Sequence, residues 1–144
     1  MNLQRFYNLV CNEYRGIEFE IDQDSTNENK IAFSCSVTSE QNFDDGVYVR
    51  IIAYQSGTLH VFFTFDKLDK NLNNYELLNE FNCNSSFLKG YIDDINGKNF
   101  LKFHFLSTDI TSEDTLCEDV VFAFDQLLAD KTLQYLKPLT RYTY

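Results

Sequence analysis

The amino-acid sequence predicts an α+β fold, an antiparallel β-sheet meander with helices packed on it, in the order α-β-β-β-β-α-β-β-α. Three observations support this prediction. Segments near both ends and in the middle have helical apolar spacing, the segments between them have strand composition, and short turn signals join neighbouring strands. The chain has 144 residues with only 5 Gly and 1 Pro, and no repeat or linker-like stretch. We therefore expect one domain over residues 1–144.

The first helix is expected over residues 2–14, where apolar side chains recur at the i, i+3, i+4 and i+7 positions of one face. These side chains are Leu3, Phe6, Tyr7, Val10, Cys11 and Tyr14. Gly16 stands in the usual position past a helix end. A middle helix is expected over residues 72–83, where Asn73 or Asn74 can cap the first turn. Its apolar side chains are Leu72, Tyr75, Leu77, Leu78 and Phe81.

The last helix is expected to begin near Thr111 or Ser112, because the two acidic residues that follow favour the positive end of a helix dipole. It is expected to run to about Leu136, ahead of Pro138, because proline disrupts a helix interior. Its core face is expected to hold Leu116, Val120, Val121, Phe124, Leu127 and Leu128.

Six segments have strand composition, either alternating apolar and polar residues or rich in β-branched and aromatic ones. They are residues 17–22, 30–38, 47–54, 58–65, 87–93 and 99–106. Gln55-Ser56-Gly57 predicts a hairpin between the two richest segments. Asn96-Gly97 predicts a second hairpin, because both residues tolerate the positive φ of a two-residue turn.

The net charge is -10, and it is unevenly distributed. Residues 13–45 hold nine acidic and two basic residues, and residues 109–130 hold seven acidic and no basic residues, so each segment has a net charge of -7. The last 14 residues have a net charge of +3. Such a chain repels nucleic acid phosphate, so we expect no direct nucleic-acid partner. The acidic segments form either a solvated surface or a surface for a basic protein partner.

Several features favour a cytoplasmic location without membrane insertion. No apolar run approaches the roughly 20 residues that cross a bilayer, and the first residues lack the basic-then-apolar order of a signal peptide. The four cysteines are widely scattered and have no C-x-x-C spacing; they are Cys11, Cys35, Cys83 and Cys117. We expect them to be reduced core residues.

No motif of a hydrolase, nucleotide-binding protein or zinc protease occurs in the sequence. Asp94-Ile95-Asn96-Gly97 fails as a calcium loop, because the first and twelfth ligand positions would be Ile92 and Phe103. His60 and His104 lie in expected strands, on the side opposite the larger apolar set, and are interpreted as surface imidazoles. A shared metal site would require them to be cross-strand neighbours with a third ligand nearby. We therefore assign no catalytic, cofactor or metal residues and expect a protein that is not an enzyme.

Two sets of apolar side chains are candidate interaction residues. The stripe of the first helix either packs on its own sheet or forms a partner-binding surface. Its members are Leu3, Phe6, Tyr7, Val10 and Tyr14. The middle helix is a candidate dimer interface through Leu77, Leu78 and Phe81. The closing residues 141–144 are expected to be a frayed tail rather than a docking strand.

The element order and several segments resemble a known family. An amphipathic first helix precedes a strand meander, then come the helix Tyr75-Glu76-Leu77-Leu78-Asn79-Glu80-Phe81-Asn82, a hairpin from Phe87 to Phe105, and a helix that opens with Thr111-Ser112-Glu113-Asp114. This pattern resembles the YbjN-type family, which shares its fold with the small acidic chaperones of type III secretion. The resemblance implies a non-enzymatic protein, and for the secretion chaperones an acidic homodimer that holds an extended stretch of a partner chain. Four strands instead of three precede the middle helix here, which favours the broader YbjN-type branch.

The leading hypothesis is therefore a chaperone-like, non-catalytic protein–protein interaction module. It binds a partner polypeptide through apolar helix and sheet surfaces. A homodimer is one form that this module could take. The alternative is an acidic inhibitor or immunity protein, a nucleic-acid mimic that occupies a basic groove of its target. Salt separates the two, because electrostatic binding weakens steeply with ionic strength whereas apolar burial does not.

Overall fold

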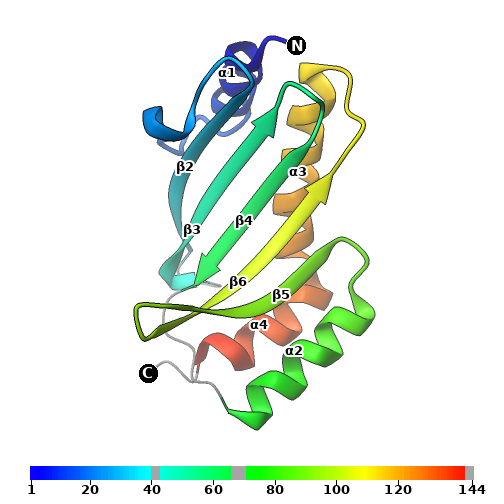
Figure 1. Ribbon diagram of the computed structural model, residues 1–144. Helices are drawn as coiled ribbons and strands as arrows, with labels where there is room; N and C mark the ends of the chain where they lie inside the picture. Colours follow the sequence, from blue (N-terminus) through cyan, green and yellow to red (C-terminus); the bar gives the residue numbers. More distant parts are fainter. Residues whose placement is uncertain (40–42, 66–70, 142–144) are drawn as a thin grey trace.

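The computed structural model describes residues 1–39, 43–65 and 71–141, and it confirms the α+β class. Within this part of the chain, six strands form one antiparallel sheet that four helices accompany (Figure 1). The elements are α1 (Leu3–Glu13), β1 (Glu20–Ile21), a 3₁₀ turn (Gln23–Ser25), β2 (Lys30–Ser39), β3 (Phe43–Tyr54), β4 (Leu59–Phe65), α2 (Leu72–Asn84), β5 (Leu88–Ile95), β6 (Lys98–Ser107), α3 (Glu113–Leu128) and α4 (Asp130–Arg141).

The sheet has the strand order β1-β2-β3-β4-β6-β5, and every neighbouring pair is antiparallel. The chain crosses from β4 over α2 to the edge strand β5, and then returns through β6 to lie beside β4. Both expected hairpins are confirmed. In the second, Asn96 and Gly97 have φ values of 53° and 82°, as a two-residue turn between antiparallel strands requires.

The strand expected over residues 17–22 is shorter in the structure, where β1 contains only two residues. The backbone before β1 is held by a helix instead of a strand, because the hydroxyl of Tyr7 donates a hydrogen bond to the carbonyl of Phe19 (3.2 Å). After β1, the Asp22 side chain accepts a hydrogen bond from the Ser25 amide and starts the 3₁₀ turn. Contacts before and after β1 therefore limit the length of this edge strand.

The single last helix expected up to Leu136 is wrong, because two helices meet at Ala129, whose ψ of 144° is extended. The start is confirmed, since Ser112 accepts a hydrogen bond from the Thr115 amide as the N-cap of α3. The bend turns α4 under the end of the sheet, where Leu136 and Leu139 are buried. Burial of these side chains offsets the backbone hydrogen bond that Pro138 cannot make, so α4 continues through the proline. Residues 142–144 of the expected tail lie outside the described part of the chain.

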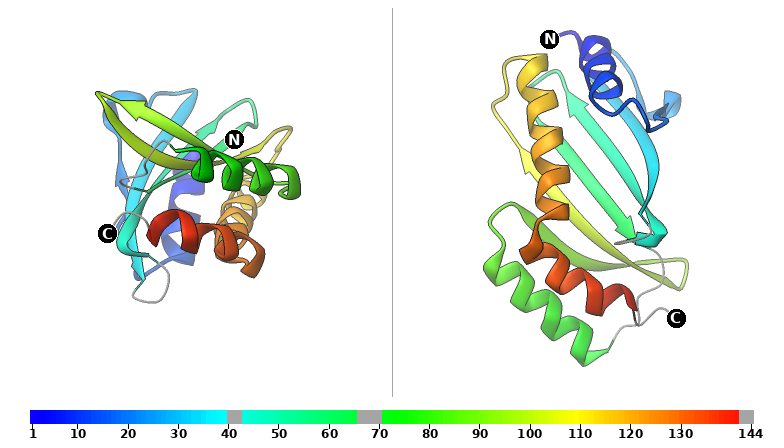
Figure 2. Two further views of the ribbon diagram at one scale, coloured as in Figure 1. Left: turned by 90° about the horizontal axis from the view of Figure 1, so that it is seen from below. Right: turned by 180° about the vertical axis from the view of Figure 1, so that it is seen from behind.

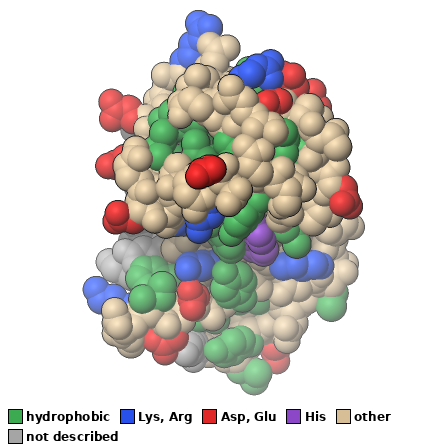
Figure 3. Space-filling view, turned by 45° about the horizontal axis from the view of Figure 1, so that its top comes forward, with side chains coloured by type: hydrophobic (Ala, Val, Ile, Leu, Met, Phe, Trp, Pro, Cys, Tyr) green, Lys and Arg blue, Asp and Glu red, His purple; other side chains and the backbone are tan. Residues whose placement is uncertain are grey.

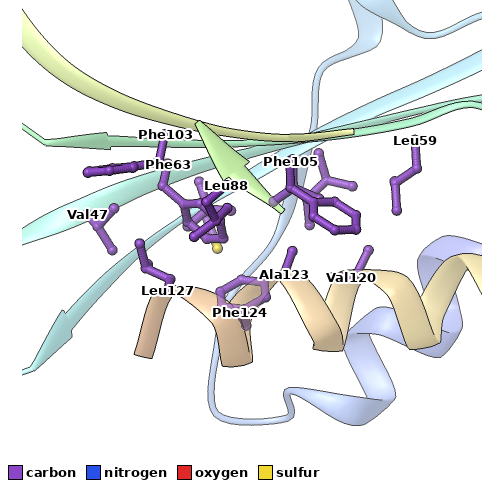
Figure 4. Close-up of a cluster of buried hydrophobic side chains, with 14 of the residues drawn as sticks. Val47, Leu59, Phe63, Leu88, Phe103, Phe105, Val120, Ala123, Phe124 and Leu127 are labelled. Carbon is purple, nitrogen blue, oxygen red and sulfur yellow. The ribbon is translucent and has the colours of Figure 1, made fainter. Parts of the chain in front are cut away.

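The helices cover one face of the sheet. Figure 2 shows α1 and α3 packed behind the long strands, and α2 and α4 side by side at the end where β5 lies. The buried side chains of the sheet and the helices form one hydrophobic cluster. In its centre, Phe63 and Leu88 point toward Phe124 and Leu127 of α3 (Figure 4). None of the described helices is long and apolar enough to cross a membrane.

Candidate functional site: the outer face of the sheet

The face of the sheet opposite α1 and α3 is covered by none of the described helices (Figure 1). Side chains alternate across a sheet, so every second residue of β3, β4 and β6 points away from the core. The burial of β4 follows this period without exception, with Leu59, Val61, Phe63 and Phe65 buried and the residues between them half-buried. The residues that alternate with the core therefore line a separate outer face.

This outer face is apolar and aromatic on the central strands. We define the outer patch as eight of the apolar, aromatic or imidazole side chains on this face: Tyr48, Ile52, Tyr54, His60, Phe62, Tyr91, His104 and Leu106. The strand register sets Phe62 opposite His104, and His60 opposite both Ile52 and Leu106. Leu106 is 51% exposed and Tyr48 is 43% exposed. Figure 3 shows the histidine side chains at the surface among hydrophobic ones.

The centre of the outer patch is a stack of three rings. The rings of Phe62 and His104 are stacked with centroids 4.4 Å apart, and the planes of His60 and His104 differ by only 8°. Nδ1 of His60 and Nε2 of His104 are 2.9 Å apart and share a hydrogen bond. Tyr54 contacts His60 edge-on at 6.1 Å. The rings support one another and form a flat apolar surface on the two central strands.

Both imidazoles favour the neutral form. Burial lowers the pKa of His60 and of His104 below the ordinary 6.5, and the neighbouring His60 lowers the pKa of His104 further. Both rings are therefore uncharged at pH 7.

Three cations of this face are engaged by other groups. The Arg50 guanidinium lies 3.1 Å from a carboxylate oxygen of Asp22, and the Lys102 ammonium lies 2.8 Å from a carboxylate oxygen of Asp93. The Lys89 ammonium donates hydrogen bonds to two backbone carbonyls at the end of α2. In a chain with a net charge of -10, the outer patch is thus close to neutral.

Part of each edge of the sheet is already occupied. At the β5 edge, the Asn82 amide donates a hydrogen bond to the Gly90 carbonyl (2.8 Å) and its carbonyl oxygen accepts one from the Gly90 amide (2.7 Å). The Ser85 hydroxyl accepts a hydrogen bond from the Leu88 amide. The residues of α2 therefore occupy positions that an added strand would use. At the other edge, β1 has only two residues.

The conditions for a metal or thiol site are only partly met. His60 and His104 are neighbours across β4 and β6, as a shared site requires. Among the described residues, however, no group of three or more His, Cys, Asp and Glu side chains comes together. Cys35 lies on the inner face, and burial raises the pKa of its thiol to about 12, which keeps the thiol protonated.

The candidate residues of the first helix mostly lie inside the molecule. Leu3, Phe6 and Val10 are buried, while Tyr7 and Tyr14 are half-buried. Of the two alternatives for this stripe, packing on the sheet is therefore the one that the fold adopts.

The candidate dimer residues of α2 also lie mostly inside the molecule. Leu78 and Phe81 are each only 3% exposed, and the Phe81 ring contacts the Phe103 ring edge-on at 5.1 Å. Leu77 is half-buried against the same core. The apolar spacing that predicted an interface thus belongs to the core, and a dimer through Leu78 and Phe81 would require α2 to leave it.

An acidic surface lies on the opposite side of the molecule, where α1 packs against α3. We define the acidic seam as Glu13, Asp114, Glu118 and Asp125. Burial and the charges of Asp125 and Glu13 raise the pKa of Tyr14. Burial, Glu13, Asp114 and Glu118 raise the pKa of the Cys117 thiol. The negative charges therefore act together on groups within the seam.

The outer patch was not predicted from the sequence, although the sequence contains a signal for it. A strand with one solvated face has polar residues at every second position. Residues 47–54 (VYVRIIAY) and 58–65 (TLHVFFTF) instead carry apolar or aromatic residues at both parities. In an antiparallel sheet, this composition indicates a second apolar face.

A scan against protein-family models finds no match for this chain, and a search of curated proteins finds none.

Proposed function

We propose that this chain is a non-catalytic protein–protein interaction module that binds a partner polypeptide on the outer patch. The observation that carries the proposal is an exposed apolar and aromatic surface on the central strands of a strongly acidic chain. Exposed apolar surfaces of this kind mark interaction sites in folded proteins, and Tyr side chains are enriched in binding hot spots.

The position of the patch favours binding by side chains over strand addition. Asn82 and Ser85 occupy backbone positions at the start of the β5 edge, and β1 is itself only two residues long, whereas the patch lies on the inner strands of the sheet. A partner segment that lies across β3, β4 and β6 would bury the rings of Tyr48 and Phe62 and the side chain of Leu106. We expect such a segment to be apolar, because the patch itself is apolar and aromatic and the nearby Arg50 and Lys102 are already paired.

Binding of this type is chaperone-like, since it covers an apolar stretch of another chain. Membership of the YbjN-type family remains a prediction that agrees with the α+β fold and with four strands before α2. The proposed location is the cytoplasm, where reducing conditions suit the four free thiols. A second copy of this chain is one candidate partner, and binding of this copy through the outer patch would give a homodimer.

The test compares two matched changes of exposed apolar residues. Tyr48→Ser with Leu106→Ser alters the outer patch, and Leu128→Ser alters an exposed leucine at the end of α3 (46% exposed). The partner is captured from cells that produce the protein and identified by mass spectrometry, and sedimentation velocity measures self-association. The proposal predicts at least about tenfold weaker binding for the outer-patch variant, since hot-spot residues cost about 2 kcal/mol or more. Equal binding by both variants would refute it.

The second candidate function is an acidic inhibitor, and the acidic seam favours it. In that case Glu118→Gln with Asp125→Asn should weaken binding, whereas the outer-patch variant should not. A salt series gives an independent test. Binding through the seam should weaken steeply with ionic strength, and binding through the outer patch should persist at high salt.

A further inference from the structure

The two histidines of the chain present ring nitrogens to each other at a distance that suits a metal ion. Nδ1 of His60 and Nε2 of His104 are 2.9 Å apart. Metal–imidazole bonds are about 2.0–2.1 Å long, so two ligands in neighbouring positions at 90° are about 2.8–3.0 Å apart. Two tetrahedral ligands would be about 3.3–3.4 Å apart. The observed separation is set by a hydrogen bond, and a small rotation of each ring would give the spacing of two neighbouring ligands of a tetragonal or octahedral ion.

The two rings are held in place by the sheet. His60 and His104 project from the adjacent strands β4 and β6, and Phe62, which lies opposite His104 in the register, stacks on its ring. Tyr54 contacts the other ring edge-on. The backbone holds the two imidazoles side by side on neighbouring strands, and binding of one ion requires each ring to rotate out of the present hydrogen bond.

The surroundings of the pair allow an ion to enter. Both rings are half-buried on the uncovered face (Figure 3). Lys89, which lies opposite His104 in the register, directs its ammonium group to the carbonyls of Asn82 and Ser85. Arg50 is paired with Asp22. No free positive charge of these residues is therefore directed at the pair.

We infer that His60 and His104 form a two-histidine clip for a divalent transition-metal ion of the Ni²⁺ or Cu²⁺ type, with water in the remaining positions. Each ring tilts so that its lone pair points at an ion above the line that joins the nitrogens. The ring that donates the present hydrogen bond moves its proton to its other ring nitrogen, and the hydrogen bond is then replaced by two metal bonds. This clip is independent of the partner-binding proposal, since it requires only the two imidazoles.

The test uses Ni²⁺, because Cu²⁺ also oxidises exposed thiols. Isothermal titration of the full chain at pH 7 should show one Ni²⁺ site. His60→Gln and His104→Gln should each weaken it by about tenfold or more, because the second imidazole acts at a high effective concentration. Across metals, the affinity should rise from Mn²⁺ to Co²⁺ to Ni²⁺. Cys83→Ser is the matched control, since it removes an exposed thiol that could also bind metal, and it should leave the site unchanged.

A measurement on the unaltered protein makes the test independent of how the variants fold. Paramagnetic Ni²⁺ should broaden the imidazole NMR signals of both histidines at lower concentrations than it broadens signals elsewhere. The clip is wrong if wild-type protein does not bind Ni²⁺ below about 1 mM. It is also wrong if folded His60→Gln and His104→Gln bind Ni²⁺ as tightly as wild type, or if Cys83→Ser abolishes binding.

Discussion

Replacing Asn82 with Ala tests the interaction that closes the β5 edge. The side chain makes two hydrogen bonds to Gly90, at 2.8 and 2.7 Å, and both are partly buried. A hydrogen bond contributes about 1 kcal/mol net, so the loss of both costs about 2 kcal/mol. Alanine has a higher helix propensity than asparagine, which offsets about 0.5 kcal/mol of this loss. We therefore expect a decrease of about 1.5 kcal/mol in the free energy of unfolding.

Asn84→Ala is the matched control for this substitution. Asn84 lies in the same helix, and its amide donates an exposed hydrogen bond to the Glu80 carbonyl. Substitution there should change stability by no more than about 0.5 kcal/mol. Urea denaturation at pH 7 gives both values, and hydrogen exchange of the Gly90 amide should accelerate only in Asn82→Ala. If the two variants are equally stable, or if Gly90 exchange is unchanged, α2 does not protect the edge.

Three further predictions concern the fold. Gly57 has a φ of +94°, and a Cβ there would collide with the Ile110 carbonyl oxygen, so Gly57→Ala should cost at least about 1–3 kcal/mol in thermal or urea unfolding. Hydrogen bonds from Ser25 and Arg50 lower the pKa of Asp22; its stabilising contribution is therefore present above about pH 4 and is lost as the pH falls through the lower folded-state value. Asp22→Asn should thus be less stable than wild type at pH 7, and urea titrations should show this difference shrinking at pH 3. The buried Cys35 thiol, whose pKa is raised to about 12, should resist a thiol reagent at pH 8 until urea unfolds the chain; labelling of the native protein would contradict its placement.

The strands and the second hairpin could be predicted from sequence because local chemistry determines them. A period of two identifies the buried side of a strand, and Asn96-Gly97 suits the positive φ values of its turn. The start of α3 was also predictable, because Ser112 caps it with its own hydroxyl. In these segments, the local preference and the tertiary structure agree.

The break between α3 and α4 could not be predicted, because Ala129 is a good helix former and no local residue interrupts the pattern. The bend accompanies burial of Leu136 and Leu139 and packs α4 against α2, which is distant in sequence. The stripes of α1 and α2 were ambiguous for a related reason. The same apolar spacing serves a helix that packs on its own sheet and a helix that binds a partner.

The contact between His60 and His104 was also beyond sequence reasoning. Alternation places each imidazole on the outer face, but it does not reveal which strands are neighbours. The two residues meet because β4 pairs with β6 rather than with β5, although α2 and β5 separate β4 from β6 in the chain. A candidate site on a sheet face thus depends on strand order, which the residue pattern leaves open.

Site-specific photo-cross-linking tests most directly whether the outer patch is where a partner binds. A photoreactive phenylalanine derivative replaces either Leu106 on β6 or Leu128 on α3, two leucines with similar exposure of 51% and 46%. Irradiation of the protein in its own cells, followed by mass spectrometry, identifies covalent adducts at each position. We predict that one polypeptide is cross-linked from position 106 and not from position 128. Adducts from position 128 with none from position 106 would place the binding surface on the helices and contradict it.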